Sequence, residues 1–135
     1  MKKIYIASSW KNQHAVELLS RILRQKGYTV LSFVENNYGE GHAEKPVDFE
    51  SWMQTEQADN SFEYDTDGAT KSDLVIYISP SGTDAWAEVG AAWAAGIHIL
   101  GLWAKGEQAG LMRKMVSWFD RYDEMLEYLE INFKP

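Results

Sequence analysis

The pattern of apolar and polar positions divides the chain into short buried strands with amphipathic helices between them. Four apolar runs have the length and the β-branched or aromatic content of strands. They cover residues 3–7, 28–34, 74–79 and 97–103. Between the first two runs, apolar residues recur at helical spacing over residues 13–26, and Gly27 follows as a stop signal. Strand, helix and strand in this order predict a parallel, right-handed crossover.

The second half of the chain repeats this alternation. A helix is expected over residues 83–95, and Gly96 is the residue that ends it. Residues 116–119 are a candidate short edge strand, and Asp120 is a candidate cap of a last helix. These elements predict one domain over residues 1–135. We expect an α/β three-layer sandwich with a four- or five-stranded parallel sheet in the flavodoxin-like order 2-1-3-4-5.

Residues 35–72 form the least regular part of the pattern. A turn-rich loop over 36–42 is long enough to act as a lid or as a partner surface. Asp48 is a candidate cap of a short helix, and a second helical piece is expected over residues 62–71. Three acids stand near the start of that piece, and we interpret them as a solvated face that favours a helix N-terminus. They are Glu63, Asp65 and Asp67.

Composition excludes several kinds of site. The net charge of −7 argues against binding a nucleic-acid polymer through its phosphates, although a small nucleotide needs only a few donors. The chain has no cysteine, no apolar run long enough to cross a bilayer and no signal-peptide pattern, so we expect a cytoplasmic protein without membrane contact. Its three histidines lack metal-like spacing, and it has neither a P-loop nor a Gly-x-Gly-x-x-Gly motif. We predict no metal and no cofactor.

One stretch, the turn and helix over residues 79–90, carries the unusual chemistry. Thr83 or Asp84 is placed to cap the helix that follows the turn. Within that helix, Glu88 shares one face with three alanines. The alanines are Ala85, Ala92 and Ala95. A carboxylate on an apolar face is costly to bury without a purpose, so we interpret Glu88 as functional, with a structural carboxylate as the alternative.

The carboxyl ends of the first and third strands are neighbours in the predicted order, at the switch point where α/β sheets bind ligands. Seven residues are expected to converge there. They are Ser8, Ser9, Trp10, Ser81, Gly82, Asp84 and Glu88. The serines would equally satisfy their turns, and Trp10 and Trp86 are candidate base-stacking residues that core or interface packing also explains. A carboxylate nucleophile at an anomeric carbon fits this set, as one possibility among several.

Three segments carry a family resemblance. They are residues 3–10, 72–75 and 81–92, the last containing Glu88-x-Gly90-x-Ala92. They resemble the nucleoside 2-deoxyribosyltransferase superfamily, which includes deoxynucleoside 5′-monophosphate N-glycosidases. The resemblance implies that Glu88 is the nucleophile that takes the sugar, that Tyr5 orients it and that Asp73 assists the base. It also implies that the Ser8-Ser9 loop and the Ser81-Gly82 turn contact sugar or phosphate, and that a neighbouring subunit of a homo-oligomer closes the pocket.

One departure from the family pattern narrows the expected reaction. Transferases of this superfamily place an aspartate six positions before the glutamate, and Gly82 stands there in this chain. The phosphate-recognising hydrolases also lack that aspartate, so Gly82 favours nucleotide hydrolysis over base exchange. We expect cleavage or transfer at the N-glycosidic bond of a small (deoxy)nucleoside or nucleoside 5′-monophosphate. The alternative is a non-catalytic nucleotide-sensing domain of the same fold, in which Glu88 only holds a ribose hydroxyl.

Overall fold

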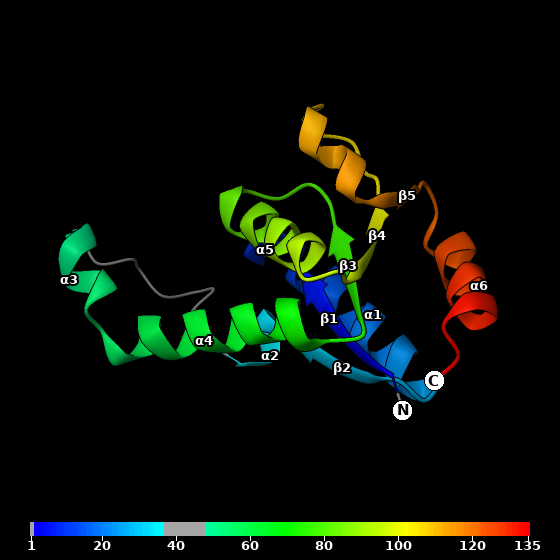
Figure 1. The fold of residues 1–135 in the computed structure, drawn as a ribbon, viewed down its shortest axis with the longest axis horizontal. Helices are drawn as coiled ribbons and strands as arrows, with labels where there is room; N and C mark the ends of the chain where they lie inside the picture. The colour runs from blue at the N-terminus through cyan, green and yellow to red at the C-terminus, as the bar shows by residue number, and fades with distance from the viewer. Residues whose placement is uncertain (1, 37–47) are drawn as a thin grey trace.

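The computed structural model describes residues 2–36 and 48–135 and contains a five-stranded, all-parallel sheet (Figure 1). Its strands are β1 (Lys3–Ala7), β2 (Thr29–Ser32), β3 (Leu74–Ile78), β4 (His98–Leu102) and β5 (Ser117–Phe119). Their order is β2-β1-β3-β4-β5, so the direction of winding reverses between β1 and β3. The predicted α/β class, parallel sheet and strand order are confirmed, and the short edge strand is present.

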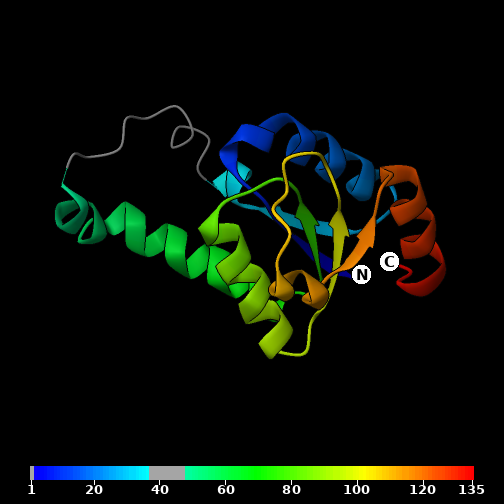
Figure 2. The same ribbon diagram turned by 90° about the horizontal axis from the view of Figure 1, so that it is seen from above.

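Helices cover both faces of the sheet and complete a three-layer sandwich (Figure 1, Figure 2). One face is covered by α1 (Gln13–Gln25) and α6 (Tyr122–Asn132), and the other by α4 (Glu56–Lys71) and α5 (Thr83–Ala94). Shorter helical pieces connect these elements. They are η1 (Trp10–Asn12), α2 (Phe33–Asn36), α3 (Phe49–Met53) and η3 (Leu111–Met115). In both views α3 and the first turns of α4 extend away from the sheet as an arm.

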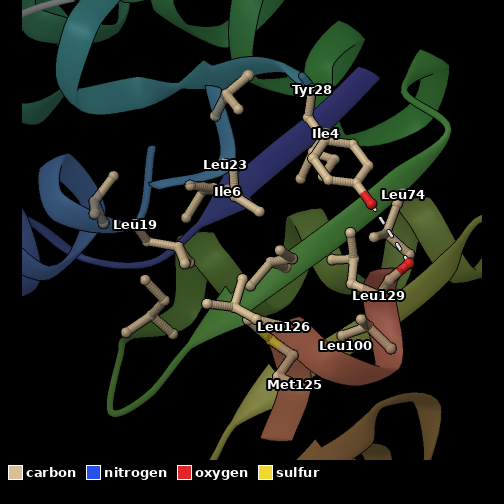
Figure 3. Close-up of a cluster of buried hydrophobic side chains, with 14 of the residues drawn as sticks. Ile4, Ile6, Leu19, Leu23, Tyr28, Leu74, Leu100, Met125, Leu126 and Leu129 are labelled. Carbon is tan, nitrogen blue, oxygen red and sulfur yellow. Dashed lines mark hydrogen bonds between the residues drawn. The ribbon is translucent and has the colours of Figure 1, made fainter. Parts of the chain in front are cut away.

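Alternation along the strands divides the core into two layers. Ile4 and Ile6 of β1 face α1 and α6, where they join a cluster made mainly of buried aliphatic side chains (Figure 3). Tyr5 and Ala7 face the other way and join a cluster that contains Tyr77 of β3 and three alanines of the covering helices. The second layer therefore combines tyrosine hydroxyls with small side chains, and polar groups gather there.

The helix α4 is longer than the sequence pattern indicated. It begins at Glu56, because the Thr55 hydroxyl caps it by accepting a hydrogen bond from the Ala58 N–H at 3.1 Å. The three acids that were expected at a helix start are therefore in the middle and last turns of α4. The interpretation of these acids as a solvated face is wrong for Asp65, because its Oδ1 atom is buried.

The start of α5 also differs from the prediction. Gly82 is its N-cap residue and makes no side-chain capping bond, so neither Thr83 nor Asp84 caps this helix. Its end is as predicted, because Gly96 follows with a φ of 79° in the left-handed region that favours glycine. The last helix begins at Tyr122, with Arg121 and not Asp120 as its N-cap.

The loop that was expected to act as a lid or partner surface falls mainly on residues 37–47, which lie outside the described residues. Within the described part of the chain, no helix is both long and apolar enough to cross a membrane.

Candidate active site

The site begins with a tyrosine and a glutamate that are 83 positions apart in sequence. Tyr5 lies in the middle of β1, is fully buried, and donates a hydrogen bond from its hydroxyl to Glu88 Oε1 of α5 at 2.6 Å. Gly68 allows α4 to pass directly over the Tyr5 ring, since a Cβ at Gly68 would lie 2.4 Å from Tyr5 Cδ1. The predicted pair of Glu88 and Tyr5 is therefore in direct contact, enclosed by two helices and the sheet.

The surroundings of Glu88 oppose its negative charge. Burial, as the largest cause, and the nearby charges of Asp65 and Asp84 together raise the pKa of Glu88 to about 8. The hydrogen bond from Tyr5 acts in the opposite direction and lowers the Glu88 pKa. The pKa of Tyr5 is raised well above its usual value, first by burial and then by the charges of Glu88 and Asp65. Glu88 is therefore an acid whose ionised form is held at high energy near neutral pH.

Asp65 belongs to this site, and sequence reasoning missed it. It lies on α4 one turn before Gly68 and Ala69, the two buried residues of that helix. Its charge and a side-chain hydrogen bond raise the pKa of Tyr5, which places it beside the Tyr5 hydroxyl. Asp65 lies three positions before Gly68 and four before Ala69, so it shares a helical face with two small residues that can be buried. This spacing was the available sequence signal. The helix expected over residues 62–71 contains this spacing, but Asp65 was interpreted there as part of a solvated face near the helix start.

The two serines that follow β1 have different surroundings. The Ser8 hydroxyl donates to the Ile78 carbonyl at 2.7 Å and accepts from Asn12 Nδ2 at 3.0 Å. Asn12 also donates to the Pro80 carbonyl at 2.8 Å, so these bonds join the carboxyl ends of β1 and β3. Ser9 Oγ is buried and has no hydrogen-bond partner within the described residues. Of the two, Ser9 is the one with a hydroxyl proton to offer a ligand.

The two tryptophans proposed for base stacking are both engaged in packing. Trp10 packs edge-on against Phe33 at a centroid distance of 5.2 Å, in the aliphatic layer. Trp86 of α5 lies 4.8 Å from the Tyr77 ring, and the Arg113 guanidinium sits 4.1 Å from its ring centre. The buried Trp86 N–H lies beside the Tyr77 oxygen without completing a hydrogen bond. Core packing accounts for both side chains as they stand.

A second polar cluster lies on the same side of the sheet. Tyr77 donates a hydrogen bond to Glu107, which lies in the segment after β4 and whose side chain is 1% exposed. Arg113 of η3 donates to Glu107 Oε2 from Nη2 at 2.8 Å and from Nε at 3.3 Å. The Ser81 hydroxyl lies 2.6 Å from the Tyr77 hydroxyl. Sequence reasoning did not identify Tyr77, Glu107 or Arg113.

Three further predicted residues have clear positions. The Asp73 carboxylate accepts a hydrogen bond from the Lys3 N–H at 2.7 Å, where β1 and β3 begin. It is not among the charges that perturb Glu88, so the structure does not bring Asp73 to the site. Asp84 is exposed in the first turn of α5 and is electrostatically coupled to Glu88. Gly82 is exposed, and a Cβ there would meet no atom within 4 Å.

Glu88 lines neither of two surface hollows, and the described residues around it form no metal site. Within residues 2–36 and 48–135, no group of three or more His, Asp or Glu side chains is arranged to hold a metal ion. One surface hollow lies along α3, and another lies at the amino end of β4 beside Trp93 and Met115. The site consists of a partly buried carboxyl group, a tyrosine that is hydrogen-bonded to it and two neighbouring acids.

Comparison with known proteins identifies solved structures of the same fold. A 2-deoxyribosyltransferase from the psychrotolerant bacterium Bacillus psychrosaccharolyticus superposes with a TM-score of 0.69 at 23% identity, over 91% of this chain and 89% of that one. The CMP N-glycosidase BcmB from Clostridium botulinum superposes with a TM-score of 0.62 at 22% identity, over 96% of this chain and 99% of that one. No protein-family model and no curated protein sequence matches the chain. At these identities the likeness establishes the fold.

Proposed function

We propose that the protein cleaves or transfers at the N-glycosidic bond of a small nucleoside or nucleoside 5′-monophosphate, as a member of the nucleoside 2-deoxyribosyltransferase superfamily. The observation that carries this proposal is the partly buried Glu88, which is held by the Tyr5 hydroxyl at 2.6 Å and has two acids and no cation among the charges that perturb it. In such surroundings the ionised carboxylate is destabilised. Forming a neutral ester with a sugar removes the unfavourable charge, so the surroundings favour attack on the sugar.

The chemistry follows from that arrangement. In the first step Glu88 attacks the anomeric carbon, the bond from this carbon to the base nitrogen breaks, and the base leaves with the electron pair and takes up a proton. In the second step water, or a second base, attacks the same carbon and releases Glu88. Tyr5 holds one carboxylate oxygen, so the other oxygen is the one that faces the sugar. Only the ionised fraction of Glu88 is nucleophilic, and this fraction grows as the pH rises toward about 8.

The structural neighbours support this assignment through their own activities. One is named a 2-deoxyribosyltransferase and the other a CMP N-glycosidase. Both reactions concern the bond between a sugar and a base, which agrees with the glutamate-centred motif that the sequence shares with the superfamily. Ser9, with its unpartnered hydroxyl, and Ser81 are proposed to contact the sugar or its 5′ substituent.

A homo-oligomer is part of the proposal. Large apolar side chains are exposed on the surface near α4, α5 and η3. They are Phe62, Trp93, Leu111 and Met112. A second copy that covers such side chains would also limit the access of water to the site. Sedimentation velocity at micromolar concentration is expected to show a dimer or a larger assembly, and a monomer would contradict this part of the proposal.

A nucleotide-sensing domain remains the second candidate, and one observation favours it. With a pKa of about 8, Glu88 is largely protonated at pH 7 and can donate a hydrogen bond to a ribose hydroxyl without reacting. A sensor and a catalyst differ in what happens after the ligand binds.

The deciding experiment is a release assay. The protein is incubated at pH 8 with the four common deoxynucleosides, the four ribonucleosides and their 5′-monophosphates, with and without an added free base, and the products are separated by chromatography. The expected result is base release or exchange by the wild type and none by Glu88→Ala, with Glu127→Ala on the exposed side of α6 as the matched control. Binding without turnover by the wild type, and weaker binding by Glu88→Ala, would instead support the sensor.

A further inference from the structure

A directed chain of hydrogen bonds ends at Ser81, at the turn between β3 and α5. It starts at Arg113, whose guanidinium donates twice to Glu107 Oε2. Glu107 accepts a hydrogen bond at its other oxygen from the Tyr77 hydroxyl. The Tyr77 oxygen lies 2.6 Å from Ser81 Oγ. Each of these four side chains is buried or partly buried, so this chain of hydrogen bonds lies within the folded structure and not on its surface.

Counting protons along this chain fixes the role of Ser81. The Arg113 guanidinium has donors only, and Glu107 is the acceptor in both bonds from Arg113 and in the bond from Tyr77. The single hydroxyl proton of Tyr77 is therefore committed to Glu107. The contact between Tyr77 and Ser81 then needs the proton of Ser81, so Ser81 donates to Tyr77. Ser81 can therefore offer a ligand only its oxygen lone pairs, as a hydrogen-bond acceptor.

The charges around Ser81 act in the same direction. Arg113 is a cation close to α5, and it is held between Glu107 and the Trp86 ring, 4.1 Å from the ring centre. Its two hydrogen bonds go to Glu107 and not to Ser81. Asp84 lies in the first turn of α5, and the Glu88 site lies one turn further along. A dianionic phosphate beside Ser81 would meet carboxylates without gaining a compensating cation from this cluster.

We propose that Glu107, acting through Tyr77, fixes the Ser81 hydroxyl as a hydrogen-bond acceptor, so that Ser81 selects a substrate with a free 5′-hydroxyl over one with a 5′-phosphate. The inference rests on the proposed function and refines its substrate class. Ser81 is a specificity residue that contacts substrate, while Tyr77 and Glu107 are positioning residues. The preference is opposite to the one suggested by Gly82, which on sequence alone favours a nucleotide.

One feature of the structure competes with this inference. The N-terminus of α5 has no side-chain cap, so its first backbone N–H groups are available to an anion. Asp84 already supplies a negative charge to that first turn. The balance between the helix end and the Ser81 acceptor is decided by comparing phosphorylated and unphosphorylated substrates.

The test measures one ratio in four proteins: kcat/KM for a deoxynucleoside divided by kcat/KM for its 5′-monophosphate, for all four common bases. The proteins are the wild type, Tyr77→Phe, Ser81→Ala and the double variant. The wild type is expected to prefer the nucleoside. Tyr77→Phe frees the Ser81 proton for a phosphate oxygen, so the ratio is expected to fall by about tenfold, as for one hydrogen bond to a charged group. With Ser81→Ala present, Tyr77→Phe is expected to leave the ratio unchanged.

Comparing the effect of Tyr77→Phe with and without the Ser81 hydroxyl separates the inference from a general structural effect of Tyr77. Such a structural effect would act whether or not the Ser81 hydroxyl is present. A wild type that prefers the monophosphate, a ratio unmoved by Tyr77→Phe, or an equal fall in the Ser81→Ala background would each overturn it. If none of the proteins releases base, the proposed function fails by itself. The same ratios are then formed from dissociation constants measured by calorimetry, and they support or overturn the inference by the same criteria.

Discussion

Two tyrosine–glutamate pairs stand on neighbouring strands and on the same face of the sheet. Tyr5 of β1 bonds Glu88, and Tyr77 of β3 bonds Glu107. In both pairs a buried tyrosine donates to one oxygen of a carboxyl group, which is buried in Glu107 and partly buried in Glu88. Judged by this hydrogen bond alone, the two pairs would be assigned the same role.

The two pairs differ in the charge that faces the glutamate. Glu107 has Arg113 within 2.8 Å, so its ionised form is compensated. Glu88 has Asp65 and Asp84 in its surroundings, and its pKa is raised to about 8. A buried carboxylate that is paired with a cation has a structural role, because removing either partner leaves an unpaired buried charge. A carboxyl group that is removed from water and surrounded by other acids destabilises the folded state when it ionises. Such a loss of stability is typical of a group that takes part in a reaction.

The largest expected effect is on stability at alkaline pH. Glu88→Gln mimics the protonated side chain, so it is expected to match the wild type near pH 4.5. Because the pKa of Glu88 rises from 4.5 to about 8 on folding, the folded wild type binds one more proton than the unfolded chain between these values, and its unfolding free energy falls as the pH rises. At pH 8 the variant is expected to be more stable by roughly 4 kcal/mol in urea unfolding.

Glu127→Gln, on the exposed side of α6, is the control for this measurement, and it should show no pH-dependent difference from the wild type. A difference between Glu88→Gln and the wild type that stays constant from pH 4.5 to pH 8 would mean that Glu88 is not destabilised by its charge.

The compensated pair is expected to respond in the opposite sense. Arg113→Met removes the cation from a glutamate whose side chain is 1% exposed, and should lower the unfolding free energy by about 3 kcal/mol. The value lies at the low end for buried pairs because Arg113 is 24% exposed. Adding Glu107→Gln to Arg113→Met should recover much of the loss. If the double variant is no more stable than Arg113→Met, the uncompensated charge is not the cause.

A smaller effect is expected from the tyrosine that orients Glu88. Its hydrogen bond lowers the Glu88 pKa, so Tyr5→Phe should move the rising limb of the kcat/KM profile to higher pH and reduce activity at pH 7 by about tenfold. Tyr28→Phe is the matched control, because the Tyr28 hydroxyl bonds the Phe133 carbonyl on the opposite face of the sheet. A profile that falls in height without moving along the pH axis would argue for a purely steric role of Tyr5.

The sequence was sufficient for the fold because its signals are local. Apolar runs, helical spacing and the glycines after two helices determine the elements, and a parallel crossover leaves few ways to order the strands. The same local reasoning identified Glu88, since a carboxylate on an alanine face is visible within one helix. The Tyr5 partner came from a family resemblance, because 83 positions separate it from Glu88.

The rest of the site could not be predicted because it depends on contacts between elements. Tyr77, Glu107 and Arg113 meet across a strand, a loop and η3, and no periodicity joins them. Ser8 looked available for a ligand, but a carbonyl of β3 takes its proton. Asp65 and Asp73 are both acids that precede β3 in the sequence, and the structure separates them: Asp65 lies beside the Tyr5 hydroxyl, and Asp73 binds the Lys3 N–H at the amino end of the sheet.

These two acids provide the finest test of which charges act on Glu88. Asp65 raises the pKa of Glu88, so Asp65→Asn should move the rising limb of the kcat/KM profile to lower pH. Asp73 accepts its bond from Lys3 at the amino end of the sheet, so Asp73→Asn should leave the profile in place, with kcat/KM within about twofold of the wild type and a loss of stability of about 1 kcal/mol. Since each variant replaces a carboxylate by an amide of the same shape, only the position of the charge differs between them. A shift of the profile by Asp73→Asn, and none by Asp65→Asn, would restore the family-based assignment of Asp73 and remove Asp65 from the site.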